Sequence, residues 1–152
     1  MPLKMRPSGL RRVAADDFFV DLYQTALEPG ELLVALRVPV VKPNQRWAFD
    51  ELARRRGDYA IVGAGVLAAF ESDKIENIRI AFLSVGSTPV RAKATEAMLT
   101  GNILNADTIH RAQVALETDL DPPDDKHMTA TMRMHLARVL LGRLLHRLGE
   151  AA

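Results

Sequence analysis

The chain has 152 residues, of which 48% are hydrophobic and 26% are charged, a composition typical of one globular domain with a buried core. Its net charge of +1 gives no electrostatic reason to expect nucleic-acid binding, and the absence of cysteine excludes disulfides, iron–sulfur clusters and cysteine nucleophiles within this chain. The sequence has no apolar run of membrane-spanning length and no signal-peptide pattern at its basic N-terminus, so we expect a cytoplasmic protein.

The first third of the sequence predicts short elements separated by turns. Residues 1–14 alternate weakly around a Pro-Ser-Gly turn and predict a small hairpin, and residues 16–19 place two acids before two phenylalanines, a pattern expected for one helical turn. The sequence EPGE at 28–31 predicts a turn. It is followed by LLVALRVPV at 32–40, which is rich in β-branched residues and predicts a strand.

The middle of the chain predicts three consecutive strands. Residues 46–53 alternate in side-chain type and predict the first strand, which is followed by a charged loop at 54–58. Residues 59–70 and 75–85 lie on either side of a polar turn at 71–74, and the second of these segments alternates between apolar and polar side chains. A strand, a short polar turn and a second strand predict a β-hairpin.

The second half of the chain changes to helical patterns. The dipeptide Thr88-Pro89 is typical of a helix start, and it precedes a helix expected over residues 92–99. Another helix is expected over residues 108–116, with Asp107 as its N-cap.

The longest predicted helix spans residues 129–148. Its apolar side chains recur at helical spacing and are expected to form one stripe that faces the core: Met132, Leu136, Val139, Leu140, Leu144 and Leu148. Because strands come first and helices second, the order favours an α+β fold. We expect an antiparallel sheet of three or four strands packed against about three helices.

The stretch IVGAGVLA at 61–68 contains the pattern G-x-G-x-x-A, which occurs in dinucleotide-binding turns. That fingerprint requires a buried strand before the first glycine, a helix after the last, and an acid about 20 residues further on. Leu83 and Ser84 occupy that distance, and the polar turn after the strand leaves no room for a crossover helix. We therefore interpret Gly63 and Gly65 as small residues on a strand against which another element packs closely.

Four segments together resemble one protein family. The segment FDELARRRGDYAIVGAGVLAAF at 49–70 resembles the glycine–aspartate–aromatic segment of the flavoprotein (medium) subunits of molybdenum hydroxylases, the carbon monoxide dehydrogenase and xanthine dehydrogenase family. The segments at 17–39, 84–101 and 124–145 are similar to the entry to that subunit's C-terminal domain, its strand-to-helix junction and its closing helix. The resemblance runs in the right order from residue 13 to residue 148 and implies the fold of that domain.

The resemblance also implies a function. Such subunits carry FAD, which passes electrons between an iron–sulfur small subunit and an acceptor, while a molybdopterin large subunit oxidises the substrate. Most FAD contacts come from glycine-rich loops of an N-terminal domain, so we expect FAD only together with that domain and none in the isolated chain, which is not expected to be catalytic alone. Residues 1–14 would be a remnant of that FAD domain or a hairpin, and residues 15–152 the C-terminal domain.

In that family, positions that match Leu33 and the loop after Phe49 approach the flavin ring. The resemblance therefore implies a set of flavin-contacting residues: Leu33, Arg55, Gly57, Asp58 and Tyr59. Gly57 would allow a positive φ, Asp58 would accept a backbone hydrogen bond, and the loop arginines would favour the anionic reduced flavin. The xanthine dehydrogenase branch has a lysine where this chain has Asp50, so Asp50 is not counted in the set.

Two alternatives remain open for these features. Residues 54–58 would equally suit a surface turn whose arginines pair with Asp50, Glu51 or Asp58. For the whole chain, the second hypothesis is a stand-alone interaction module or a gene fragment that keeps the fold and has no redox role.

A metal site is not expected. Asp124, Asp125 and His127 are residue types that bind hard metals, but acids at the N-terminus of the following helix are the preferred interpretation. His135 and His146 lie eleven residues apart, which is about three helical turns and too far for one metal ion.

Overall fold

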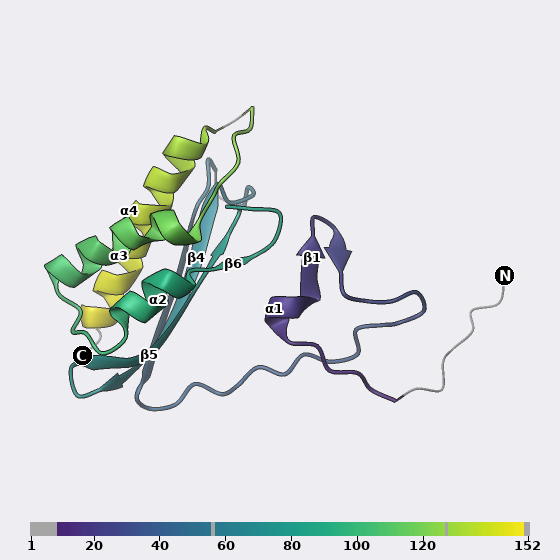
Figure 1. Ribbon diagram of the computed structural model, residues 1–152, viewed down its shortest axis with the longest axis horizontal. Helices are drawn as coiled ribbons and strands as arrows, with labels where there is room; N and C mark the ends of the chain where they lie inside the picture. The colour runs from purple at the N-terminus through teal and green to yellow at the C-terminus, as the bar shows by residue number, and fades with distance from the viewer. Residues whose placement is uncertain (1–8, 56, 127, 151–152) are drawn as a thin grey trace. The chain divides into compact units, whose positions relative to one another are not determined.

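The computed structural model describes residues 9–55, 57–126 and 128–150. The chain divides into two compact units, Met1–Val40 and Val41–Ala152, which we call the N-terminal and C-terminal units (Figure 1). Each unit has its own secondary structure and is described separately.

The described part of the N-terminal unit, residues 9–40, contains three short elements. The helical turn α1 (Ala15–Phe18) leads into a two-stranded antiparallel sheet of β1 (Phe19–Asp21) and β2 (Gln24–Thr25). The predicted helical turn at 16–19 is therefore confirmed apart from its last residue. The predicted turn at 28–31 is also confirmed, since the Glu31 N–H donates to the Glu28 carbonyl at 2.9 Å.

Two predictions for the N-terminal unit have a different outcome. The strand expected at 32–40 is wrong, because these residues adopt neither helix nor strand. A strand requires a neighbour with which it can form a ladder, and in the described part of the chain these residues pair with none. Residues 1–8 of the hairpin expected at 1–14 lie outside the described residues, and residues 9–14 form no strand.

The C-terminal unit is built on one antiparallel sheet. Its strands are β3 (Gln45–Leu52), β4 (Val62–Glu71), β5 (Lys74–Leu83) and β6 (Val90–Arg91), which lie side by side in that order. Three helices follow along the chain and cover one face of the sheet (Figure 1): α2 (Lys93–Leu99), α3 (Ala106–Asp119) and α4 (Ala130–Glu150). The predicted α+β fold is confirmed.

The G-x-G-x-x-A stretch is part of the β4–β5 hairpin. This stretch lies inside β4, and no helix begins at Gly65, so it is a strand and not a dinucleotide-binding turn. The hairpin register shifts between Ala69 and Phe70, because Ala69 pairs with Asn77 whereas Phe70 pairs with Ile75. This bulge resets the alternation of β5 and lets Ile75 join the buried side chains that follow it in the strand.

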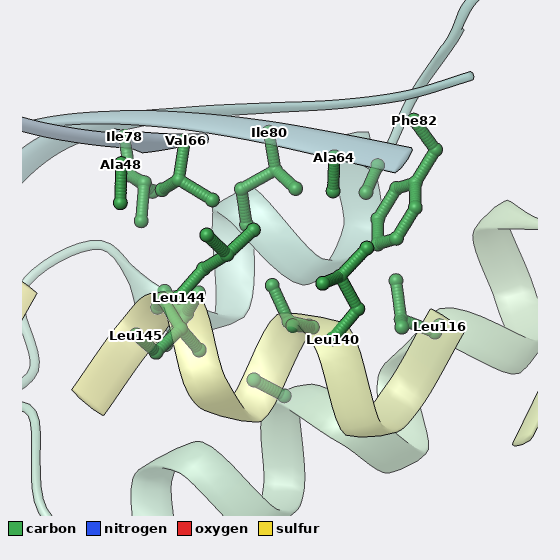
Figure 2. Close-up of a cluster of buried hydrophobic side chains, with 14 of the residues drawn as sticks. Ala48, Ala64, Val66, Ile78, Ile80, Phe82, Leu116, Leu140, Leu144 and Leu145 are labelled. Atoms are coloured by element: carbon green, nitrogen blue, oxygen red, sulfur yellow. The ribbon is translucent and has the colours of Figure 1, made fainter. Parts of the chain in front are cut away.

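The core lies between the sheet and the helices. Alternate residues of β4 point toward the helices and are at least nine-tenths buried: Val62, Ala64, Val66, Ala68 and Phe70. Figure 2 shows Val66 and Ile80 pointing from the sheet toward Leu140 and Leu144 of α4. The small alanines of β4 leave space for the leucines of α4, and they allow the helix to pack closely on the central strand.

The buried face of α4 differs from the predicted stripe. Met132 is 48% exposed, and Leu136 and Val139 are only partly buried. The buried residues of the helix are Arg133, Ala137, Leu140, Leu141, Gly142, Leu144, Leu145 and Leu148. The helix carries apolar residues around much of its circumference, so docking onto the sheet and α3, and not the local pattern, selects the buried face.

Two helix starts also differ from the prediction. Asn105, not Asp107, caps α3 by accepting a hydrogen bond from the Thr108 N–H at 2.8 Å. Thr88-Pro89 does not start a helix, because the chain first forms β6 and α2 begins at Lys93. None of the helices in the described part of the chain combines the length and apolarity required to cross a membrane.

Candidate functional site

All four strands of the C-terminal unit have one terminus at the same edge of the sheet, the edge that runs across the strand ends. β3 ends at Leu52 and β4 begins at Val62, so the β3–β4 loop (residues 53–61) leaves from this edge. Because the strands are antiparallel, β5 ends and β6 begins at the same edge, and the β5–β6 loop (residues 84–89) lies beside the first. Four of the five predicted site residues belong to the β3–β4 loop.

Backbone hydrogen bonds connect several of the described residues of the β3–β4 loop. The Asp58 N–H donates to the Arg55 carbonyl at 3.1 Å, which closes a turn around Gly57. Gly57 has a φ of 81°, so the predicted positive φ is confirmed. The Asp58 Oδ1 accepts a hydrogen bond from the Tyr59 N–H at 2.9 Å, as expected for an acid that accepts from the backbone. The base of the loop is closed where the Ile61 N–H donates to the Leu52 carbonyl at 2.7 Å.

Tyr59 is the most exposed large hydrophobic residue among the described residues of this loop, with 95% of its surface accessible. The sheet face opposite the helices carries Trp47 and Phe49 of β3, which are 67% and 50% exposed. Phe49 lies across from Gly65, where an added Cβ would come within 3.7 Å of the Phe49 ring. Small residues of β4 and exposed aromatic rings of β3 therefore form an apolar surface next to the loop, of the kind that marks a binding surface.

Asp50 lies on the other side of β3. It pairs with Ala64, which is fully buried under the helices, and its carboxylate accepts from Arg147 of α4 at 2.5 Å. Asp50 thus joins the sheet to the end of α4, and its side chain is not on the face that carries Phe49. Asp50, one of the three acids expected as partners for the loop arginines, therefore pairs with Arg147 of α4. Arg56, the middle arginine of the loop, lies outside the described residues.

The fifth predicted site residue, Leu33, lies in the N-terminal unit. It is 51% exposed and belongs to no regular element. The structure therefore brings Arg55, Gly57, Asp58 and Tyr59 together in one loop, and Leu33 stays a separate prediction.

A buried arginine at this edge was not predicted. Arg133 of α4 has a side chain that is 9% exposed, and its Nη1 donates to the carbonyls of Ile61 and Ser84 at 3.0 and 2.8 Å. Its Nη2 donates to Asp125 at 2.5 Å. The only signal in the sequence was a charged residue among apolar neighbours of an amphipathic helix, which is also what a solvent-facing arginine looks like.

The acids before α4 accept backbone hydrogen bonds, Asp124 from the first residue of the helix and Asp125 in the turn that precedes it. The Asp124 Oδ1 accepts from the Ala130 N–H at 2.5 Å, and the Asp125 Oδ1 accepts from the Met128 N–H at 2.9 Å. His127, the third member of the metal cluster considered above, lies outside the described residues. Within the described ranges, no group of three His, Cys, Asp or Glu side chains is placed to hold a metal ion.

The comparisons with known proteins agree with this fold. The family model described as CO dehydrogenase flavoprotein C-terminal domain matches residues 47–148, and the chain belongs to this family. The chain is 37% identical to a caffeine dehydrogenase subunit beta from Pseudomonas sp. (strain CBB1), over 99% of this chain and 51% of that protein. It is 35% identical to a carbon monoxide dehydrogenase medium chain from Afipia carboxidovorans, over 93% of this chain and 49% of that protein.

Solved structures show the same similarity. A reconstituted CO dehydrogenase from Oligotropha carboxidovorans matches with a TM-score of 0.89 and 34% identity, over 96% of this chain and 51% of that one. Quinoline 2-oxidoreductase from Pseudomonas putida 86 matches with a TM-score of 0.85 and 33% identity, over 95% and 50% of the two chains. The chain therefore spans about half the length of the curated relatives and the solved chains that it matches.

Proposed function

We propose that this chain is the C-terminal half of an FAD-dependent medium subunit of a molybdenum hydroxylase. In that subunit it covers one side of the flavin that passes electrons between iron–sulfur clusters and an acceptor. The observation that carries the proposal is the family match over residues 47–148, because it includes the β3–β4 loop and all of the four-stranded sheet except the first two residues of β3. The alternative, an interaction module or gene fragment without a redox role, has no observation in its favour.

The β3–β4 loop has the properties that a flavin-covering loop requires. Tyr59 presents an exposed aromatic ring, and aromatic rings stack on planar ring systems such as isoalloxazine. Chain neighbours aside, no described residue comes within 4 Å of the place where a Cβ of Gly57 would be, so the backbone there is open to a ligand. Arg55 adds positive charge to the loop, which favours the anionic reduced form of a flavin by Coulomb attraction. Leu33, Arg55, Gly57, Asp58 and Tyr59 are the proposed contacts.

The phosphates of FAD need a different part of the subunit. A pyrophosphate is held by free backbone N–H groups at a glycine-rich turn or a helix N-terminus. Gly63 and Gly65 cannot supply them, because β4 pairs with β3 on one side and with β5 on the other. We therefore propose that an N-terminal FAD-binding domain supplies the phosphate contacts and that the isolated chain binds FAD weakly or not at all.

This domain does not determine the substrate specificity of the parent enzyme. The relatives are named for caffeine, carbon monoxide, 6-hydroxypseudooxynicotine and glyceraldehyde, yet this chain is 37%, 35%, 34% and 30% identical to them. Similar identity across unrelated substrates is expected if this domain handles electrons and a large subunit handles the substrate. The proposed partners are therefore a molybdopterin large subunit and an iron–sulfur small subunit, in a cytoplasmic complex.

A fusion protein tests the proposal. In this fusion subunit, the present chain replaces the corresponding half of the Afipia carboxidovorans medium chain, and bound flavin is measured by visible absorbance after gel filtration. The fusion subunit should retain FAD, whereas the isolated chain should lose it. Tyr59→Ala in the fusion subunit should change the flavin absorption bands and slow acceptor reduction, and Tyr59→Phe, which keeps the ring, should not. An isolated chain that stays yellow, or a Tyr59→Ala fusion with unchanged flavin spectrum and acceptor reduction, would contradict the proposal.

A further inference from the structure

Arg133 joins three segments that are far apart in the sequence. One guanidinium nitrogen bonds two carbonyls, that of Ile61 just before β4 and that of Ser84 just after β5, and the other bonds the Asp125 carboxylate before α4. The side chain is 9% exposed, and its Nε makes no hydrogen bond in the described part of the protein. The anchoring of the two loops to α4 at this point therefore rests on its Nη atoms.

The two carbonyls lie where the sheet stops. Gly63 and Leu83 form the last residue pair between β4 and β5, so Ile61 and Ser84 lie beyond the β4–β5 ladder at this end. Ser84 has a φ of 64°, which turns the chain out of the sheet direction. Backbone carbonyls that leave a ladder inside a protein need another donor, and Arg133 supplies one to both.

We propose that Arg133 is a positioning residue that sets the β3–β4 loop, and with it Tyr59, against the flavin. Ile61 is held through its N–H by Leu52 and through its carbonyl by Arg133, so both peptide groups around it are fixed. Tyr59 is only two residues away, and its ring position depends on that anchor. Burying a guanidinium costs more than burying an apolar side chain of similar volume, so what Arg133 contributes is placement of the loops. This inference rests on the function proposed above.

The choice of arginine follows from its shape. Its planar fork presents separate donors to two carbonyls and one carboxylate at the same time, whereas a lysine ammonium is a single point of charge. Arg133→Lys should therefore hold the loops only in part, and Arg133→Met should release them. Arg138→Met is the matched control, because Arg138 lies on the same helix, also has a buried Nε without a partner, and pairs with Glu117 of α3 and not with the sheet edge.

The first test uses the full chain. Amide hydrogen exchange is measured by mass spectrometry for peptides that cover residues 53–61 and 84–89, with the unfolding midpoint in urea measured in parallel. Arg133→Met should speed exchange in both loops by roughly tenfold or more, the factor expected for loss of a hydrogen bond to a charged group, while the centre of β4 stays protected. Equal loop exchange in Arg133→Met and Arg138→Met would overturn the inference. If Arg133→Met does not fold, Arg133→Lys and Asp125→Asn are measured in its place.

The second test uses the flavin of the fusion subunit as the reporter. Arg133→Met should shift the flavin absorption bands in the same direction as Tyr59→Ala, and Arg138→Met should leave them in place. A change with Tyr59→Ala but none with Arg133→Met would overturn the positioning role and leave the proposed function standing. Unchanged flavin absorption bands in Tyr59→Ala would overturn the proposed function, and with it the inferred effect of Arg133 on the flavin. The amide-exchange result for the two loops would be unaffected by that outcome.

Discussion

Glu96 of α2 and Arg91 of β6 form a two-bond ion pair, with Nε–Oε1 and Nη2–Oε2 distances of 2.8 and 2.7 Å. The same Glu96 carboxylate accepts the Ile80 N–H of β5 at 2.7 Å. β6 contributes only two residues to the sheet. Beyond its end, the Glu96 carboxylate takes the place of a strand neighbour and accepts the free N–H group of β5. The helix, the edge strand and β5 are thus held at one point.

Replacing Glu96 should destabilise the fold. Glu96→Ala leaves the Ile80 N–H and the Arg91 guanidinium without their acceptor, and hydrogen bonds to a charged group contribute about 1.5–3 kcal/mol. We expect the free energy of unfolding, measured in urea, to fall by about 2–3 kcal/mol. The control is Glu117→Ala, which removes an exposed pair with Arg138 and should cost less than about 1 kcal/mol. Equal losses in the two variants would show that Glu96 has no special role.

Asp119 should act as a helix cap from a distance. Its carboxylate accepts the Ala94 and Thr95 N–H groups at 2.8 Å each, so the end of α3 caps the start of α2. We predict that Asp119→Ala lowers the free energy of unfolding by about 1–2 kcal/mol, the usual loss of an N-cap. Asp107→Ala, at an exposed i,i+4 pair with Arg111, should cost about 0.5 kcal/mol or less. Thermal unfolding followed by circular dichroism would compare the two, and the reverse order of stability would refute the cap.

Two glycines of β4 should respond differently to alanine. A Cβ at Gly63 would lie 2.9 Å from Cγ and Cδ1 of Leu83, whereas a Cβ at Gly65 would lie at an ordinary 3.7 Å from Phe49. Gly63→Ala forces Leu83 to move, and overpacking of this kind costs about 1–3 kcal/mol. Gly65→Ala should be neutral or slightly stabilising, because alanine loses less backbone entropy than glycine on folding. Urea denaturation of both variants measures this difference in unfolding free energy. Equal values would show that Leu83 moves aside without cost.

Gly57 should be sensitive through its backbone alone. Among the described residues, none except its chain neighbours lies within 4 Å of a Cβ added at Gly57, but the φ of 81° would place the alanine side chain in the left-handed region. We expect a loss of about 1 kcal/mol in unfolding free energy. Gly57→Asn should lose less, because asparagine adopts positive φ more readily. An Asn variant as unstable as the Ala variant would point to a contact of Gly57 in place of a conformational requirement.

Part of the candidate site was predictable because its signals are local. The sequence RRRGDY marks a charged loop with a glycine that takes a positive φ, and the structure confirms both the loop and the φ of Gly57. The loop's anchor was not predictable, because Arg133 meets Ile61 across 72 residues of chain and Ser84 across 49. In the sequence, nothing distinguishes this arginine from Arg138 or Arg143 of the same helix.

The sequence by itself determined the elements with a local signal: β3 and β5 through alternation, β4 through the polar turn that joins it to β5 in a hairpin, and the length of α4 through its helical period. Tertiary structure decided whatever depends on a distant partner. Residues 32–40 have the composition of a strand but pair with no other described strand, and α4 buries Arg133 and Ala137 where the apolar pattern pointed to Met132 and Leu136. The physical reason is the same in both cases: a side-chain pattern states which residues prefer burial or pairing, and only the folded chain supplies the surface that accepts them.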